Sequence, residues 1–458
     1  MGTATFVSSL FFIGGLIVDE TGSVNNTHQR KGLFSPKDLV LGFQHLLAMY
    51  SGDVLVPLLI GNYLHFSTIQ MTYLVSIDIF MCGIATLLQL KRTPLTGIGL
   101  PVVLGCAVQS VTPLESIGSK LGITYMYGAI IAAGIFVFLI AGVFSRLKKL
   151  VPPVVTGSLI TIIGFTLVPV GFQDLGGGTP TAHSFGDPKN LFIGFVTIAI
   201  ILLLNAWAKG FLKSIAILLG ILIGSFVAGA MGMVSLKPVS EAAWLHTPQL
   251  FFFGVPHFNG SAMITMILVS LTTMIESTGV FFALSEVTGQ KLTSDDIKRG
   301  YRAEGIAAIL GGLFNTFPYS TFSENVGVIR MSGVKTRRPV YYAAFMLLLL
   351  GLLPKAGALA TVIPDPVLGG AMIVMFGIVG VQGIQILHKV DFTDNGNILV
   401  ASVSVGLGLG VTMYPHIFQF LPTEFQIMMG NGVVVGSVAA VVLNLLFNGY
   451  GKEKPAKD

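Results

Sequence analysis

The chain has 458 residues, of which 53% are hydrophobic and only 10% are charged. An ordinary soluble domain carries about 25% charged residues, so this composition excludes that class and indicates several membrane-spanning segments. The net charge is +5, but the basic residues lie in short loops between apolar segments and form no basic patch with interleaved aromatic residues. We therefore expect a lipid bilayer around most of the chain and no nucleic-acid partner.

The chain contains few residues of the types that enzymes and metal sites need in clusters. Its two cysteines, Cys82 and Cys106, each lie in an apolar segment, so neither a disulfide framework nor a metal-ligand cluster is indicated. The sequence also lacks the patterns typical of serine hydrolases, zinc proteases and phosphate-binding loops. We expect no enzymatic activity, no cofactor and no metal.

Apolar segments follow one another along the chain. The first apolar run, residues 5–18, is too short to span a bilayer and has no preceding basic residue, so we assign residues 1–37 to an N-terminal segment of unknown role. Fourteen membrane-spanning segments are predicted after it, near residues 38–60, 69–90, 97–114, 122–145, 151–171, 190–208, 212–234, 260–285, 300–315, 319–333, 339–356, 365–387, 396–413 and 427–448.

The distribution of Lys and Arg supports this number of segments, because basic residues collect on the cytoplasmic side of a membrane. With the N-terminal segment inside, 22 of the 26 basic residues are cytoplasmic. The other four lie outside: Lys120, Lys189, Lys237 and Lys355. Adding or removing one segment in the middle would destroy this bias, so we predict cytoplasmic N and C termini, with residues 449–458 as a cytoplasmic tail.

Seven segments in each half place the two halves in opposite orientations, so residues 38–234 and 260–448 are predicted to be inverted repeats. The third segment of each half is interrupted by Gly and Pro, at residues 97–113 and at residues 315–333. Interrupted segments at corresponding positions of inverted halves indicate a substrate site near the midplane. Two short extended pieces that meet there would satisfy each other's backbone hydrogen bonds.

Residues 315–333, NTFPYSTFSENVGVIRMSG, carry Glu324 and Asn325 inside an otherwise apolar segment. An ionisable residue at that depth costs several kcal/mol unless a partner or ligand satisfies it, which makes the stretch a candidate binding site. Ser323 offers a further hydrogen bond, and Gly327 and Gly333 are expected to allow close approach of other backbones. The alternative is that Glu324 and Asn325 only cap a half-helix beginning near residue 324.

Two other intramembrane carboxylates are candidates for function. Glu276 lies centrally in its segment beside Ser277, and Glu304 follows Arg299 and Arg302 at the cytoplasmic end of the next segment. We expect Glu276 and Glu304 to have a functional role, although an ion pair with the neighbouring arginines would also explain Glu304.

The remaining intramembrane polar residues have equally plausible structural explanations. A lone histidine among apolar residues, such as His45, is more often structural than functional, but we retain it as a candidate proton carrier. For Asp53 a functional role and a bond to a neighbouring backbone remain equal alternatives, and Asp78 could equally face a helix partner, so neither is included among the predicted site residues.

At these residues the chain resembles the nucleobase-ascorbate transporter family, also called nucleobase-cation symporter family 2. The family signature is Gln or Glu, then Asn, any residue, Gly, four residues, and Thr followed by a basic residue or Gly. Here it reads ENVGVIRMSG, with Ser332 in place of Thr. The pair Gln44 and His45, the segment around Glu276 and the acidic Glu304 also match, over residues 36–448.

The resemblance implies an all-α polytopic membrane protein with fourteen segments in two inverted repeats. It implies a core domain at residues 38–145 and 260–356 and a gate domain at residues 151–234 and 365–448, with short β-strands in segments 3 and 10. It also implies proton-coupled uptake by an elevator-like alternating-access cycle across the plasma membrane, and a homodimer formed through the gate domains. For such a proton-coupled carrier we expect Glu276 to bind substrate and Glu276, Glu304 and His45 to carry protons.

The substrate suggested by the resemblance is xanthine, because Glu304 and the run ESTGVFFAL look like the xanthine and urate branch. Uracil and urate remain alternatives, since Glu324 occupies a position that is commonly Glu in uracil carriers. The backbone around Ala107, Val108 and Gln109 would donate to carbonyl groups of the base, opposite the carboxylates. Stacking candidates are Phe322, Tyr319 and Phe282. A more remote alternative is an anion exchanger on the same fold, against which the carboxylates argue.

Overall fold

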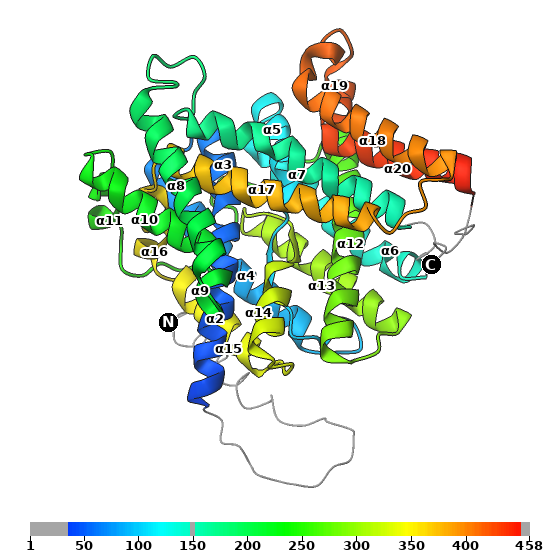
Figure 1. The fold of residues 1–458 in the computed structure, drawn as a ribbon, viewed down its shortest axis with the longest axis horizontal. Coiled ribbons are helices and arrows are strands. Elements are labelled where there is room, and N and C mark those ends of the chain that lie inside the picture. The colour runs from blue at the N-terminus through cyan, green and yellow to red at the C-terminus, as the bar shows by residue number, and fades with distance from the viewer. Residues whose placement is uncertain (1–34, 147–151, 450–458) are drawn as a thin grey trace. The chain divides into compact units, whose positions relative to one another are not determined.

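The computed structural model describes residues 35–146 and 152–449. The predictions for residues 1–34 and 450–458 therefore lie outside the described residues. From Lys37 onward, the described residues form one compact unit. Its elements, shown in Figure 1, are α2 (Pro36–Asp53), α3 (Leu55–Tyr63), α4 (Thr68–Leu90), β1 (Leu104–Cys106), η1 (Val108–Ser110), α5 (Val111–Lys120), α6 (Ile123–Phe144), α7 (Pro153–Leu175), α8 (Pro188–Trp207), α9 (Phe211–Ser214), α10 (Ala216–Ala230), α11 (Lys237–Glu241), α12 (Gly260–Thr288), α13 (Ser294–Leu313), β2 (Tyr319–Thr321), α14 (Glu324–Ser332), α15 (Arg338–Gly351), α16 (Pro354–Thr361), α17 (Asp365–Leu387), α18 (Asn395–Met413), η3 (Pro415–Phe418), α19 (Thr423–Met429) and α20 (Gly432–Asn448).

Eight of the described helical stretches are long and apolar enough to cross a membrane, and ten if two bent helix pairs each count as one span. The bent pairs are α15 with α16, at 83°, and α19 with α20, at 72°. The other four predicted segments lack a long apolar helix. They correspond to the broken stretch around β1, to the 15-residue α10, to α13 with its charged first turns, and to the β2–α14 stretch.

The helices begin and end where local chemistry requires it. α12 begins after Asn259, whose side chain accepts hydrogen bonds from the backbone N–H groups of residues 261 and 262, and ends at Gly289 in the left-handed conformation. Pro57 cannot donate to the carbonyl of residue 53, which explains why α2 and α3 are separate at Val54. The end of α2 therefore places Asp53 at a break in the helix.

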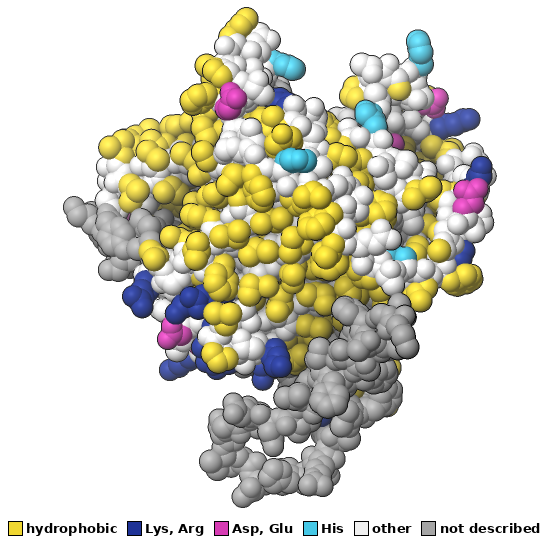
Figure 2. Space-filling model, turned by 180° about the vertical axis from the view of Figure 1, so that it is seen from behind, with side chains coloured by type: hydrophobic (Ala, Val, Ile, Leu, Met, Phe, Trp, Pro, Cys, Tyr) yellow, Lys and Arg dark blue, Asp and Glu magenta, His cyan; other side chains and the backbone are white. Residues whose placement is uncertain are grey.

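The helices pack in two sets. One set consists of α7, α8, α10, α17, α18 and α20, and α7 and α17 lie side by side along most of their length (Figure 1). The other set consists of α4, α6, α12, α13, α15 and α16, with β1 and β2 packed against it. Large apolar side chains remain exposed on the outside of the first set, including Trp207, Phe226 and Leu446, and Figure 2 shows a broad apolar surface on one face of the molecule. An apolar surface of this kind is suited to contact with the hydrocarbon chains of a lipid bilayer.

An ion-pair network connects α4 and α13 of the second set. Asp296, on the first turn of α13, pairs with Arg92 just after α4 at 2.5 Å and also with Arg299. Burial by itself would raise the pKa of Asp296, but hydrogen bonds from Thr293 and the pair of arginines outweigh it and hold this pKa below its ordinary value. The carboxylate therefore stays ionised and ties α4 to α13.

The two strands lie in the two interrupted stretches and pair with each other. The antiparallel register places Leu104 opposite Thr321, Gly105 opposite Ser320 and Cys106 opposite Tyr319. The other edge of β1 is satisfied by side chains, because the backbone N–H of Leu104 donates to Thr86 and that of Cys106 donates to Asp53. This arrangement leaves no backbone N–H of β1 unpaired in an apolar environment.

Candidate functional site

A pocket lies where the strand pair faces the first set of helices. Its walls come from both sets: α2, β1, η1, α12 and the β2 stretch on one side, and α7 and α17 on the other. The lining residues are Gly52, Cys106, Val108, Gln109, Ile163, Glu276, Ser320, Thr321, Phe322, Ser323, Met375, Phe376 and Val379. The pocket thus combines one carboxylate and several polar groups with an apolar wall, as small-molecule sites commonly do.

The predicted substrate-binding residues divide into three groups. Five of them line this pocket: Val108, Gln109, Glu276, Phe322 and Ser323. Ala107 and Asn325 are buried nearby but are not among the lining residues. Glu324 begins α14, and its side chain lies outside the described part of the structure.

Gln109 is held in one orientation by α12. Its Nε2 donates to the hydroxyl of Thr273 at 2.8 Å, which leaves Oε1 as its acceptor. The backbone N–H of Ala107 donates to the carbonyl of Pro318 at 2.9 Å, which extends the strand pairing by one step. A backbone position predicted to donate to the substrate is therefore already occupied at residue 107.

Glu304 lies behind β2, away from the first pocket. Its Oε1 accepts a hydrogen bond from the hydroxyl of Thr321 at 2.7 Å, while Oε2 has no hydrogen-bond partner among the described residues. It lines a second cavity together with Pro318 and Tyr319. Glu304 forms no ion pair with Arg299 or Arg302 among the described residues, so the ion-pair explanation of this carboxylate is wrong.

His45 contacts the signature stretch directly. Its Nδ1 lies 2.7 Å from Oδ1 of Asn325. Because an amide oxygen only accepts, Nδ1 carries the proton and donates. Nδ2 of Asn325 is buried and has no partner among the described residues. The bond joins α2 to α14 across 280 positions of sequence.

The aromatic and glycine predictions had mixed outcomes. Phe322 lines the pocket, whereas Tyr319 is buried behind the strands and Phe282 is 41% exposed on α12. Gly327 was expected to allow a close approach, and that prediction is wrong, because a Cβ there would meet nothing within 4 Å. Gly333 instead ends α14 with a left-handed φ of 65°.

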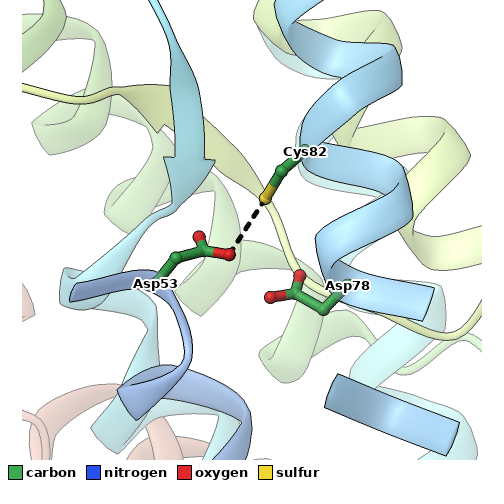
Figure 3. A group of neighbouring side chains, drawn as sticks. All are labelled: Asp53, Asp78 and Cys82. Carbon is green, nitrogen blue, oxygen red and sulfur yellow. Dashed lines mark hydrogen bonds between the residues drawn. The ribbon is translucent and has the colours of Figure 1, made fainter. Parts of the chain in front are cut away.

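Sequence reasoning missed one buried cluster. One carboxylate oxygen of Asp53, one of Asp78 and the sulfur of Cys82 all lie within 4.8 Å of one another, next to the strands (Figure 3). Asp53 ends α2, whereas Asp78 and Cys82 lie on α4, so their proximity does not follow from the sequence. The only signal in the sequence was that each carboxylate lies inside an apolar segment. Cys106 joins this cluster to the pocket, because its backbone and thiol bond to Asp53 and Asp78 while the residue also lines the pocket.

Comparisons with known proteins agree on a family. Residues 36–417 match the Permease family. The chain is 50% identical over 418 residues to the xanthine permease of Bacillus subtilis, which covers 91% of this chain and 95% of the relative. It is also 50% identical over 409 residues to uric acid permease PucK of the same organism, which covers 89% of this chain and 95% of the relative.

A solved structure shares the fold at low sequence identity. The transmembrane domain of the cyanobacterial bicarbonate transporter BicA matches with a TM-score of 0.63 and 16% identity, and the match covers 85% of this chain and 98% of that domain. The relatives are permeases and not enzymes, and the chain has many apolar helices. The chain is therefore a multi-pass membrane transporter of the plasma membrane and belongs to the Permease family, together with xanthine and uric acid permeases.

Proposed function

We propose that this permease takes up a nucleobase together with protons, and that its substrate is xanthine. The observation that carries the proposal is the pocket of Glu276, Gln109 and Phe322 beside the strand pair. A purine dione presents ring N–H donors beside carbonyl acceptors. The Glu276 carboxylate suits the donors, the Phe322 ring suits the planar face, and the polar groups at Gln109 and Ser323 suit the ring edge.

Urate is the second candidate, because a uric acid permease and a xanthine permease are equally similar to this chain. Uracil is smaller and would leave part of the apolar wall on α7 and α17 without contact. An anion exchanger is disfavoured, because the relatives at 50% identity are xanthine and uric acid permeases. The likeness to a bicarbonate transporter concerns the fold alone.

Proton coupling is assigned to Glu276, Glu304 and His45. Glu276 lies in the pocket, and Glu304 is one hydrogen bond behind it through Thr321 of β2. His45 is bonded to Asn325 at the start of α14. Each group is therefore linked to an element around the pocket, so a change in its protonation state would change the affinity of the pocket for the base.

The architecture proposed for transport is fourteen segments in two inverted repeats, 38–234 and 260–448. The antiparallel pairing of β1 and β2, one from each repeat, supports it. The packing of the helices in two sets supports a core domain at 38–145 and 260–356 that moves against a gate domain at 151–234 and 365–448. The pocket lies between these sets, as an elevator-like cycle requires.

The exposed apolar faces of the gate helices are proposed to lie in lipid or in a homodimer interface. The concentration of Lys and Arg in the cytoplasmic loops supports cytoplasmic N and C termini.

The test is the thermal stability of the purified protein with xanthine, urate or uracil at equal concentration. A ligand that binds only the folded state stabilises it by RT ln(1 + [L]/Kd), which is about 2.7 kcal/mol at one hundred times Kd. We expect xanthine to raise the melting temperature most, and Glu276→Gln to abolish the shift, because an NH2 group would then face a ligand N–H. Glu286→Gln, at an exposed position near the end of the same helix, is the matched control. A larger shift with urate or uracil would reassign the substrate.

A further inference from the structure

Asp53 and Asp78 form a pair beside the two strands, because Asp53 bonds to Cys106 of β1 and Asp78 bonds to Tyr319 of β2. Asp53 ends α2 and Asp78 lies in the middle of α4, and their side chains are 1% and 0% exposed. Figure 3 shows the two carboxyl groups pointing toward each other, with the Cys82 thiol directed at Asp53. The mechanism proposed above uses neither of them.

The hydrogen bonds to the pair occupy three of its four carboxyl oxygens. Asp53 Oδ1 accepts the backbone N–H of Cys106 at 2.6 Å, and Asp53 Oδ2 accepts the thiol of Cys82 at 3.2 Å. Asp78 Oδ1 accepts both the hydroxyl of Tyr319 and the thiol of Cys106, each at 2.9 Å. Asp78 Oδ2 is buried and has no partner among the described residues. It is therefore the one carboxyl oxygen of the pair that accepts no hydrogen bond from the described residues.

Two ionised carboxylates facing each other in this interior would repel each other and would both lack the stabilisation that water provides. Across residues 35–146 and 152–449, no Lys, Arg or His forms an ion pair with either one. The helices packed on α4 are α3, α13, α15 and α16, and no ion pair links any of their described residues to Asp53 or Asp78. The other titratable side chains beside the pair are tyrosines and cysteines, which supply no positive charge: Tyr50, Cys82, Cys106 and Tyr319. A cation must therefore come from outside.

The donors around the pair favour a proton over a metal ion. The cysteine thiols donate to the carboxylates, whereas a metal would need thiolates or free carboxylate oxygens. Sodium and calcium require several oxygen ligands, and only Asp78 Oδ2 is uncommitted. One proton on Asp78 Oδ2 would donate to Asp53 and complete the hydrogen bonding of the cluster. We propose that Asp53 and Asp78 bind one proton between them, as a carboxylic acid paired with a carboxylate, and that this is a second cation site of the transporter.

This site is linked to the pocket through both strands. Asp53 holds β1 through the backbone of Cys106, and Asp78 holds β2 through Tyr319. Cys106 and Tyr319 are opposite each other in the strand register. Glu304 bonds to the other end of β2, at Thr321, so the two sites act on different ends of the strand pair. Loss of the shared proton would leave two repelling carboxylates, one attached to each strand.

The first test does not use a base and so does not depend on the proposed substrate. Infrared spectroscopy of the purified protein resolves the carbonyl stretch of a protonated carboxylic acid. We expect the wild type at neutral pH to show one such contribution that both Asp78→Asn and Asp53→Asn remove, while Glu286→Gln leaves it in place. Identical spectra in the wild type and both variants would overturn the proposal, and either variant alone suffices if the other does not fold.

The second test deepens the proposed function and rests on it. Asn at position 78 keeps an N–H that donates to Asp53, as the shared proton would. We expect Asp78→Asn to bind xanthine with an affinity that has lost part of the pH dependence seen in the wild type, whereas Glu286→Gln keeps all of it. An unchanged pH profile would remove the pair from coupling. Failure of the wild type to bind any base would refute the proposed function and leave the infrared result standing.

A metal ion is the competing occupant, and the same protein tests it. Thermal stability is measured with Na⁺ or Zn²⁺ added to the wild type and to Asp78→Asn, without base. We expect no shift that depends on Asp78. Stabilisation of the wild type that Asp78→Asn abolishes would replace the proton by that metal ion.

Discussion

Glu304 accepts a hydrogen bond from Thr321 of β2 through Oε1, whereas Oε2 has no hydrogen-bond partner in the part of the chain that the structure describes. Gln at position 304 keeps an oxygen to accept from Thr321 and resembles the protonated acid permanently. We expect Glu304→Gln to bind xanthine and to exchange it across a membrane, but to accumulate none above the equilibrium level when a pH difference is applied, because its protonation can no longer shift the balance of states.

Reconstituted vesicles with labelled xanthine measure both activities in one preparation, with Glu286→Gln as the control that keeps both. Retained accumulation driven by pH would exclude Glu304 from the proton path. Loss of binding and exchange together would show that this carboxyl group is structural or contacts the base.

Strand β1 depends on a glycine at its centre. A Cβ at Gly105 would lie 2.9 Å from Asp53 Oδ1 and 2.9 Å from Cδ2 of Phe322, closer than real contacts allow. Gly105→Ala must therefore displace either the carboxylate that holds the strand or the ring that lines the pocket. We expect a protein that folds but binds xanthine at least about tenfold more weakly, which corresponds to about 1.4 kcal/mol.

Gly327→Ala is the matched control for this substitution, because a Cβ there would meet nothing within 4 Å and Gly327 is not among the residues that line the pocket. Binding is measured by isothermal titration or by the melting shift with xanthine. Equal affinities for the two variants would show that the space around Gly105 adapts without cost.

Hydrogen bonds across the two sets of helices are the whole-molecule feature that an elevator movement must break. Asn431, just before α20, donates from Nδ2 to the hydroxyl of Thr112 at 2.8 Å, and Thr112 lies on α5, which packs against α6 of the second set. Replacing both residues by Cys and joining them with a short thiol cross-linker should stop transport, because the two sets could no longer move apart. Xanthine binding should be retained.

Each single Cys variant, treated with the same reagent, is the control, and a reagent with a reducible linkage should allow transport to recover. The native cysteines, Cys82 and Cys106, are buried and form no disulfide. Undiminished transport by the fully cross-linked protein would contradict a movement of the core domain against the gate domain.

The sequence alone determined the class of protein, because a bilayer imposes long apolar segments on any chain that crosses it. It also located the two interrupted stretches, since Gly and Pro mark irregular backbone, and it singled out Glu276 and the signature residues, since carboxylates are rare in such segments. Phe322 and Ser323 line the pocket that the structure places there.

Only the tertiary structure decided which polar residues meet. Asp53 and Asp78 lie on different helices, and each had a plausible structural explanation by itself, so their juxtaposition with Cys82 was invisible in the sequence. The bond between His45 and Asn325 was likewise unpredictable, as was the finding that Glu304 forms no ion pair within residues 35–146 and 152–449. The local sequence shows which polar groups are buried in an apolar segment and therefore carry a free-energy penalty. The partner that offsets this penalty is determined by helix packing between distant segments.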